Sequence, residues 1–233
     1  MMKSPPRRVF LDAPWCLLLF LGACESPSGD VPLVLTCPSH GDEAGFLNLD
    51  FIPPRYTMAA GANESPPLQW NDGPTATAQW ALVAEDRDAT QNERTRWVLY
   101  HIPAYLRQLP AAIPNGNADL GREYFGIRQG RNARDSTEIG YRGPNPPSDS
   151  GVHRYRFTLY ALDALIDLPA GASREDLETA IQGHVLARTT LDGKFGEAPE
   201  DLPRTAAKFA PSSANSQADS ARRGPGPPEP DAE

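Results

Sequence analysis

The sequence predicts a mainly β domain, an antiparallel sandwich of two sheets with one or two short helices. Three observations support this class: several short apolar segments have the length and period of strands, Pro and Gly separate them, and only one segment has a clear helical pattern. The chain of 233 residues contains 25 Pro and 19 Gly, which is enough to end many short strands. Its apolar content of 39% is sufficient for a core.

Buried strands are expected at two neighbouring apolar runs. Trp80 to Ala84 is a continuous run that continues into Asp86-Arg87-Asp88. Trp97 to Ile102 is the next run, and Pro103 is expected to end it because proline cannot donate to a strand ladder.

Two further strands are expected in the second half of the chain. From Val152 to Leu162 the period of two is clear. One face of this strand carries His153, Tyr155, Phe157 and Leu159, and the other carries Arg154, Arg156 and Thr158. Val185 to Leu191 indicates the last strand, which a turn at Asp192-Gly193 is expected to close.

The helix is expected just before this last strand. Ser173 and Asp176 have the spacing of a capping box, and Leu177 and Ile181 fall on one helical face. Gly183 then supplies an end signal, because glycine readily takes the left-handed conformation that follows many helices.

Residues 1–23 are interpreted as an export signal. Basic residues are followed by a short apolar stretch that ends in Leu21-Gly22-Ala23-Cys24. The stretch is shorter than the about 20 apolar residues that span a bilayer. The pattern is typical of a bacterial lipoprotein signal, in which Cys24 becomes the lipidated N-terminus, although a plain signal peptide with an incidental cysteine fits the same run. We expect an exported protein of the cell envelope that a lipid anchor alone holds to the membrane.

The remaining chain divides into three parts. Residues 24–44 are interpreted as a spacer, residues 45–196 as the domain, and residues 197–233, rich in Pro, Ala and Ser, as a disordered tail. The formal net charge of −8 argues against a broad nucleic-acid surface. Cys37 and His40 make a single Cys–His pair, which is too few ligands for a metal site, and we expect no cofactor.

Four blocks in chain order point to a known family. They are Asn63 to Trp70 (NESPPLQW), Glu85 to Ala89 (EDRDA), Gly140 to Pro147 with Gly151 to Tyr155 (GYRGPNPP and GVHRY), and Tyr160 to Asp163 with Gly183 to Ala187 (YALD and GHVLA). Each block is weak alone, but the ordered set resembles the phosphatidylethanolamine-binding protein family, and within it the bacterial Raf-kinase-inhibitor-like proteins.

The resemblance implies a small pocket at one edge of the sandwich that accepts phosphate-like head groups and similar anions. Carried over by residue, this pocket involves Asp86, Asp88, Arg96, His153 and Tyr155, and its floor is Gly143, Pro144, Asn145, Pro146 and Pro147. The residue types fit, because imidazole and phenol groups donate hydrogen bonds to oxyanions. As alternatives, the two aspartates solvate a turn after a strand, and His153 is a structural histidine.

The sequence departs from the family pattern before the second apolar run. Arg96 stands where the family usually has His, and His101, to which we assign no role, stands where Asn is usual. An arginine stays charged and can hold an oxyanion with two donors. It can equally form an ion pair with Asp86 and fill the pocket.

A second departure is the stretch Ile127–Ile139, which is interpreted as an insertion. Five arginines between Arg122 and Arg142 stand against three acidic residues, a local excess of positive charge. A loop that overhangs the pocket would favour anions or an acidic protein partner. A solvated surface insertion is the alternative.

We therefore expect a binding module for a small anion, a phospholipid head group or a phosphorylated ligand. The alternative is an inhibitor of a kinase-like or hydrolytic enzyme that acts through the surface around the pocket. A hydrolase with Asp86 and His153 as orienter and base is the third hypothesis, and we do not expect it, because the chain lacks a nucleophile motif and H-E-x-x-H.

Overall fold

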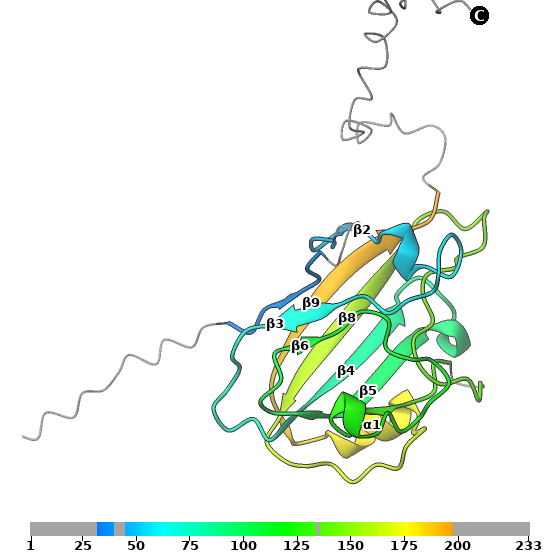
Figure 1. The fold of residues 1–233 in the computed structure, drawn as a ribbon. Helices are drawn as coiled ribbons and strands as arrows, with labels where there is room; N and C mark the ends of the chain where they lie inside the picture. The colour runs from blue at the N-terminus through cyan, green and yellow to red at the C-terminus, as the bar shows by residue number, and fades with distance from the viewer. Residues whose placement is uncertain (1–31, 40–44, 134–135, 198–233) are drawn as a thin grey trace, which may run out of the picture.

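The computed structural model describes residues 32–39, 45–133 and 136–197 (Figure 1). The expected signal segment, Cys24 and the tail from residue 198 lie outside the described residues, so these expectations remain predictions. Within the described ranges, no helix is long and apolar enough to cross a membrane.

The strands form two sheets, as the sequence predicts. A six-stranded sheet has the order β2–β9–β8–β4–β5–β7, and a three-stranded sheet has the order β1–β3–β6. The strands are β1 (Leu35–Thr36), β2 (Asp50–Phe51), β3 (Leu68–Trp70), β4 (Gln79–Asp86), β5 (Thr95–Pro103), β6 (Gln108–Leu109), β7 (Arg128–Gln129), β8 (His153–Leu162) and β9 (Val185–Phe195). The α-helix is α1 (Arg174–Ala180), and the 3-10 turns are η1 (Pro54–Tyr56), η2 (Gln91–Glu93) and η3 (Arg122–Tyr124). The pairings between neighbouring strands are antiparallel, except that β2 runs parallel to β9.

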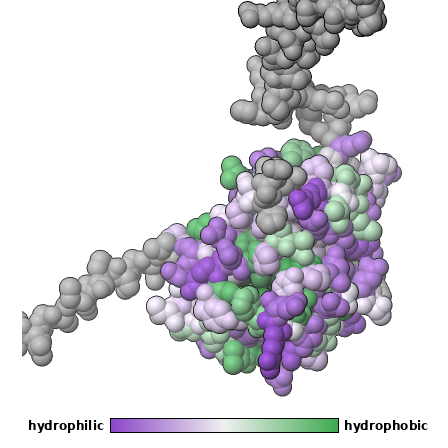
Figure 2. Space-filling model, viewed as in Figure 1, coloured by the Kyte–Doolittle hydropathy of each residue, from purple (hydrophilic) through white to green (hydrophobic). Residues whose placement is uncertain are grey.

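The six-stranded sheet buries apolar side chains on both faces. One face packs against the three-stranded sheet around Trp70, Trp80, Trp97 and Phe157. The other face packs against the segment that contains α1 and buries Val83, Val98, Tyr100 and Leu177. Because both faces are covered, every residue of β4 is buried, which accounts for the unbroken apolar run Trp80–Ala84 within it. On the face seen in Figure 2, apolar residues gather toward the middle and lower part of the domain, with polar residues around them.

The predicted helix is confirmed in its position and its cap. The Asp176 backbone N–H donates to Ser173 Oγ at 3.1 Å, and the Asp176 carboxylate accepts from the Ser173 N–H at 2.9 Å. Leu177 is fully buried, Ile181 is the C-cap residue, and Gly183 has a φ of +80° just beyond the end.

The expected end of the last strand is wrong. Strand β9 continues through Asp192 and Gly193 to Phe195 and pairs with β8 along this length. A Cβ atom on Gly193 would lie 2.5 Å from Ile52 Cγ1, so this glycine permits close packing instead of a turn.

The boundary at residue 45 is also corrected. Strand β1, from the segment interpreted as a spacer, pairs with β3. Leu35 and Cys37 are buried in the core, so the folded unit begins ahead of residue 45. Burial raises the pKa of the Cys37 thiol to about 11, which keeps it protonated and unreactive at neutral pH.

The arginine-rich segment, Arg122 to Arg142, contributes a strand to the sheet edge. Strand β7 pairs with β5, and the buried Gln129 accepts a hydrogen bond from Trp97 Nε1 at 2.9 Å. Arg128 donates to the Leu168 carbonyl, and Arg131 lies 3.8 Å from the Asp176 carboxylate. Ile127 to Ala133 are therefore neither an overhanging loop nor a solvated insertion, because the sheet edge and the core hold them.

Candidate functional site

The candidate site lies at one edge of the six-stranded sheet, where β4 ends and its two neighbours β5 and β8 begin (Figure 1). Asp86, the last residue of β4, is paired with Tyr155 of β8. The antiparallel register thereby brings together polar residues that lie far apart in the sequence. A cleft of about 330 Å³ opens beside them, and its walls include Glu93, Arg96, Arg142, Asn145, Pro146 and His153.

Asp86 organises the buried side of this cleft. Its carboxylate accepts from Arg96 Nη2 at 3.2 Å and from His153 Nδ1 at 3.0 and 3.1 Å. The backbone N–H groups of Asp88 and Ala89 donate to Asp86 Oδ1 at 3.1 and 3.2 Å. Because Asp86 is fully buried and does not line the cleft, it acts as a positioning group beneath the walls.

The structure decides part of what the sequence left open for Arg96. It forms the ion pair with Asp86, yet its side chain also lines the cleft, which is not filled. Its Nε is buried and has no hydrogen-bond partner among the described residues. One N–H donor of a buried guanidinium therefore remains for a ligand.

His153 is positioned in the same way. It lines the cleft at the start of β8, and its contact with the carboxylate of Asp86 goes through Nδ1. An imidazole that donates from Nδ1 has Nε2 left for a ligand, as an acceptor when neutral and as a donor when protonated.

Tyr155 lies beneath the cleft instead of lining it. Its hydroxyl is buried near Asp86 and the Asn145 backbone, without a well-formed hydrogen bond to either. Burial, and then the negative charge of Asp86, raises the pKa of Tyr155 above its usual range, so the phenol keeps its proton. Its ring stacks on His153 with the centroids 6.5 Å apart, which supports the imidazole from below.

The Pro-rich loop divides into a supporting half and a lining half. The Gly143 N–H donates to Asn63 Oδ1 at 2.7 Å, and the Pro144 carbonyl accepts from the Met58 N–H at 3.0 Å. Gly143 and Pro144 thus attach the loop to the domain and do not line the cleft, whereas Asn145 and Pro146 do.

Asp88 lies at the rim and is held by another charge. Its carboxylate accepts from Arg154 Nη2 at 2.5 Å, from Arg154 Nε at 3.0 Å and from the Arg154 N–H at 2.8 Å. The hydrogen bonds from Arg154 lower the pKa of Asp88 to about 2. This contact ties the turn after β4 to β8 and satisfies the carboxylate, as in the alternative interpretation of a turn aspartate.

Arg142 and Glu93 are the charged cleft residues that the sequence analysis did not assign to the site. Arg142 Nη1 donates to Glu93 Oε2 at 2.8 Å, and both side chains line the cleft. Arg142 lies inside the GYRGPNPP block, which is a signal that could have identified it, whereas nothing in the sequence marks Glu93. Of the described arginines in the arginine-rich segment, Arg142 alone lines the cleft. The described residues contain no cluster of three or more His, Cys, Asp or Glu side chains that could hold a metal ion.

Comparison with known proteins gives consistent matches. The family model described as phosphatidylethanolamine-binding protein matches residues 43–196. The UPF0098 protein of Methanothermobacter thermautotrophicus is 46% identical over 144 residues, which are 62% of this chain and 89% of that protein. A Mycobacterium tuberculosis protein named "Putative lipoprotein LppC" is 33% identical over 165 residues, 70% of this chain and 72% of that one.

The solved structures agree with the fold. The homolog CT736 from Chlamydia trachomatis has a TM-score of 0.58 and 29% identity, and the match covers 70% of this chain and 97% of that one. Escherichia coli YbcL has a TM-score of 0.58 at 22% identity, over 70% of this chain and 98% of that one, and this shows a shared fold. The match of the family model over most of the chain shows that the protein belongs to the phosphatidylethanolamine-binding protein family.

Proposed function

We propose that the protein binds a small anionic ligand, a phosphate-like head group or a phosphorylated molecule, in the cleft beside Asp86. The observation that carries the proposal is the buried Nε donor of Arg96, which has no partner among the described residues and belongs to a side chain on the cleft wall. Leaving a buried donor unpaired costs about 1–3 kcal/mol, and an oxyanion in the cleft removes that cost.

Charge on the walls supports the same ligand class. Arg96 forms an ion pair with Asp86, and Arg142 forms one with Glu93. Both guanidinium groups are therefore held in place before a ligand binds. Fixed donors lose little conformational entropy on binding. An oxyanion takes the N–H donors that these two ion pairs leave unused.

We propose binding and not turnover. Ser150, a hydroxyl on the cleft wall, donates to the Pro147 carbonyl at 2.7 Å, so it is not hydrogen-bonded to His153 as an activated nucleophile would be. We also propose an envelope location with a lipid anchor at Cys24. The support is the signal pattern in the sequence and the name of the mycobacterial relative.

The test is a titration of the full chain with inorganic phosphate, phosphoethanolamine and a neutral alcohol, followed by the thermal midpoint. A ligand that binds only the native state raises the midpoint as its concentration exceeds the dissociation constant. We expect both anions, and not the alcohol, to raise it. In Arg96→Gln the affinity should fall by about tenfold, since one charge-assisted hydrogen bond is lost.

The matched control is Arg188→Gln, on the exposed part of β9 away from the cleft, which should bind like the wild type. No shift of the wild-type midpoint with either anion contradicts the proposal. Binding that appears only in Arg96→Gln would mean that Arg96 closes the site.

A further inference from the structure

A second hollow lies at the opposite end of β4 and β5, and no residue of the candidate anion site belongs to it. It has a volume of about 490 Å³, within the range of small-molecule sites. Its floor is formed where Gln79, the first residue of β4, pairs with Pro103, the last residue of β5. Tyr105, Phe125 and Leu165 stand around it on three separate loops, and we call it the aromatic pocket.

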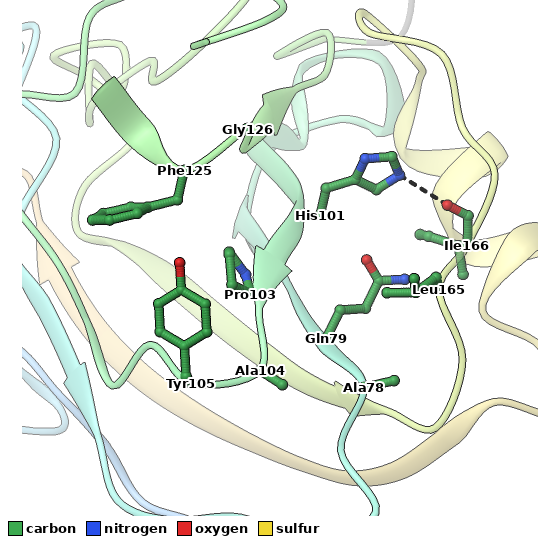
Figure 3. A pocket seen from close by; sticks show the side chains of 10 residues that line it. All are labelled: Ala78, Gln79, His101, Pro103, Ala104, Tyr105, Phe125, Gly126, Leu165 and Ile166. Atoms are coloured by element: carbon green, nitrogen blue, oxygen red, sulfur yellow. Dashed lines mark hydrogen bonds between the residues drawn. The ribbon is translucent and has the colours of Figure 1, made fainter. Parts of the chain in front are cut away.

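The walls of the aromatic pocket are large apolar side chains that face solvent. Tyr105 is 69% exposed, Phe125 55% and Leu165 79%. The rings of Tyr105 and Phe125 meet edge to face with centroids 6.3 Å apart. Figure 3 shows these two rings on one side of the hollow and Leu165 and Ile166 on the other. Exposed apolar side chains that gather around a hollow are typical of a ligand-binding or interaction site.

The floor holds a buried acceptor without a partner. Gln79 is 1% exposed, and its Nε2 donates to the Ala164 carbonyl at 2.9 Å. That carbonyl can only accept, which fixes the side-chain oxygen on the other side. Gln79 Oε1 is buried with no hydrogen-bond partner among the described residues. In Figure 3 this oxygen points toward the His101 ring, into the space between the labelled residues.

His101 holds the far wall in place and keeps it uncharged. Its Nε2 lies 2.8 Å from the Ile166 carbonyl, so the imidazole N–H donates there and links β5 to the loop before α1. Burial lowers the pKa of His101, so the ring is neutral at pH 7. Among the described residues that line the aromatic pocket, none is Asp, Glu, Lys or Arg.

These features select the chemistry of the occupant. We propose that the aromatic pocket binds an uncharged planar aromatic molecule that carries one N–H or O–H donor. The ring lies against Tyr105 and Phe125, and the donor bonds to Gln79 Oε1. A charged molecule is disfavoured because no lining group offers a counter-charge, and an apolar molecule without a donor leaves the buried oxygen unpaired.

The test uses a pair of probes that differ only in the donor. The full chain is titrated by calorimetry with indole and with 1-methylindole. We expect indole to bind at least about tenfold more tightly, since the methylated ring leaves Gln79 Oε1 unpaired. In Gln79→Met the two probes should bind equally, and its thermal midpoint verifies that this variant folds.

Exposed aromatic residues provide variants that do not disturb the core. Phe125→Ala and Tyr105→Ala should each weaken indole binding by about fivefold through the lost ring contact. Phe51→Ala is the matched control, because Phe51 is 49% exposed on β2 and does not line the pocket. Arg96→Gln should leave indole binding unchanged, which separates this pocket from the anion site.

Two results would overturn the proposal. One is equal affinity of the wild type for the two probes, or no binding of either. The other is a concentration-dependent dimer, measured by analytical ultracentrifugation, that disappears in Phe125→Ala, because the rings would then cover a second copy of the chain.

Discussion

The two ends of the β4–β5 strand pair carry opposite kinds of site. At one end, Asp86 and Arg96 are buried charges that hold each other. At the other end, roughly 23 Å away along β4, Gln79 and His101 are neutral groups below exposed rings. A ligand at the first end competes with Asp86 for Arg96, whereas nothing described competes for the oxygen of Gln79.

One pair of strands can therefore support two kinds of recognition. The middle of β4 is covered on both faces and has no room for a ligand, since each of its residues is buried. Only the ends, where the sheet stops, leave polar side chains next to a hollow. Charge at an end requires a partner inside the protein, and that partner limits how strongly the site attracts a ligand.

Neutralising Asp86 at the charged end should change the stability of the protein the most. Asp86→Asn leaves Arg96 and His153 next to an uncharged group, and we expect a loss of about 3 kcal/mol in the free energy of unfolding. The same change releases both donors, so phosphate should bind more tightly although the protein is less stable. Urea unfolding with and without phosphate measures both quantities.

A matched control is Asp192→Asn. Asp192 makes two hydrogen bonds to Arg156 at 2.7 Å, but this pair is partly exposed on β8 and β9. Its loss should cost less than about 1 kcal/mol. Equal losses in the free energy of unfolding of the two variants would show that burial does not make the Asp86 ion pair more important for stability than an exposed one.

The neutral end is expected to respond less. His101 has a φ of +57°, which asparagine tolerates, but asparagine is too short to reach the Ile166 carbonyl. We therefore expect His101→Asn to lose about 1 kcal/mol at pH 8. It should also weaken indole binding, because the wall at Ile166 is no longer held.

This loss should depend on pH. Burial lowers the pKa of His101 in the folded protein, so the unfolded chain takes up a proton first as the pH falls below about 6.5. The wild type thus loses stability in acid through this group and the variant does not, and the difference between them should shrink from pH 8 to pH 5. Urea unfolding at several pH values measures it. His184→Asn, at an exposed histidine, is the control, and a difference that grows in acid contradicts the argument.

The same contrast explains what could be predicted from sequence. Asp86 follows an apolar run, and His153 and the loop Gly143 to Pro147 lie in blocks that resemble the family, so the sequence predicted that these residues lie close together. What Arg96 does there was not predictable, since its ion pair and its place on the cleft wall depend on the packing of β4 against β5.

The neutral end gave no comparable signal. Gln79 precedes an apolar run, and Tyr105, Phe125 and Leu165 lie in apolar stretches of two or three residues that have no strand or helix period. The fold was predictable because apolar runs and turn residues act locally. Strand β1 was missed because the apolar run Val31–Leu35 is short and lies in a segment that contains Pro, Ser and Gly. The end of β9 was missed because Gly193 permits a close contact with Ile52 and does not form a turn.

Asp88, at the rim of the cleft, should contribute less to stability than the buried groups. The Arg154 hydrogen bonds hold the pKa of Asp88 at about 2, below its usual value of 3.8. A carboxylate with a lowered folded pKa stabilises the protein above its unfolded pKa, and that contribution is lost as the pH falls from about 4 toward 2. In Asp88→Asn this contribution is absent, so its thermal midpoint should lie slightly below that of the wild type at pH 6, and the gap should narrow as the pH falls from about 4 to about 2. Because the pair is exposed, 0.5 M NaCl should also narrow the gap. If salt leaves the difference in thermal midpoint unchanged, Asp88 acts through its hydrogen bond to the Arg154 backbone N–H and not through the exposed ion pair. The rim would then resemble the buried contacts of Asp86, which salt screens much less.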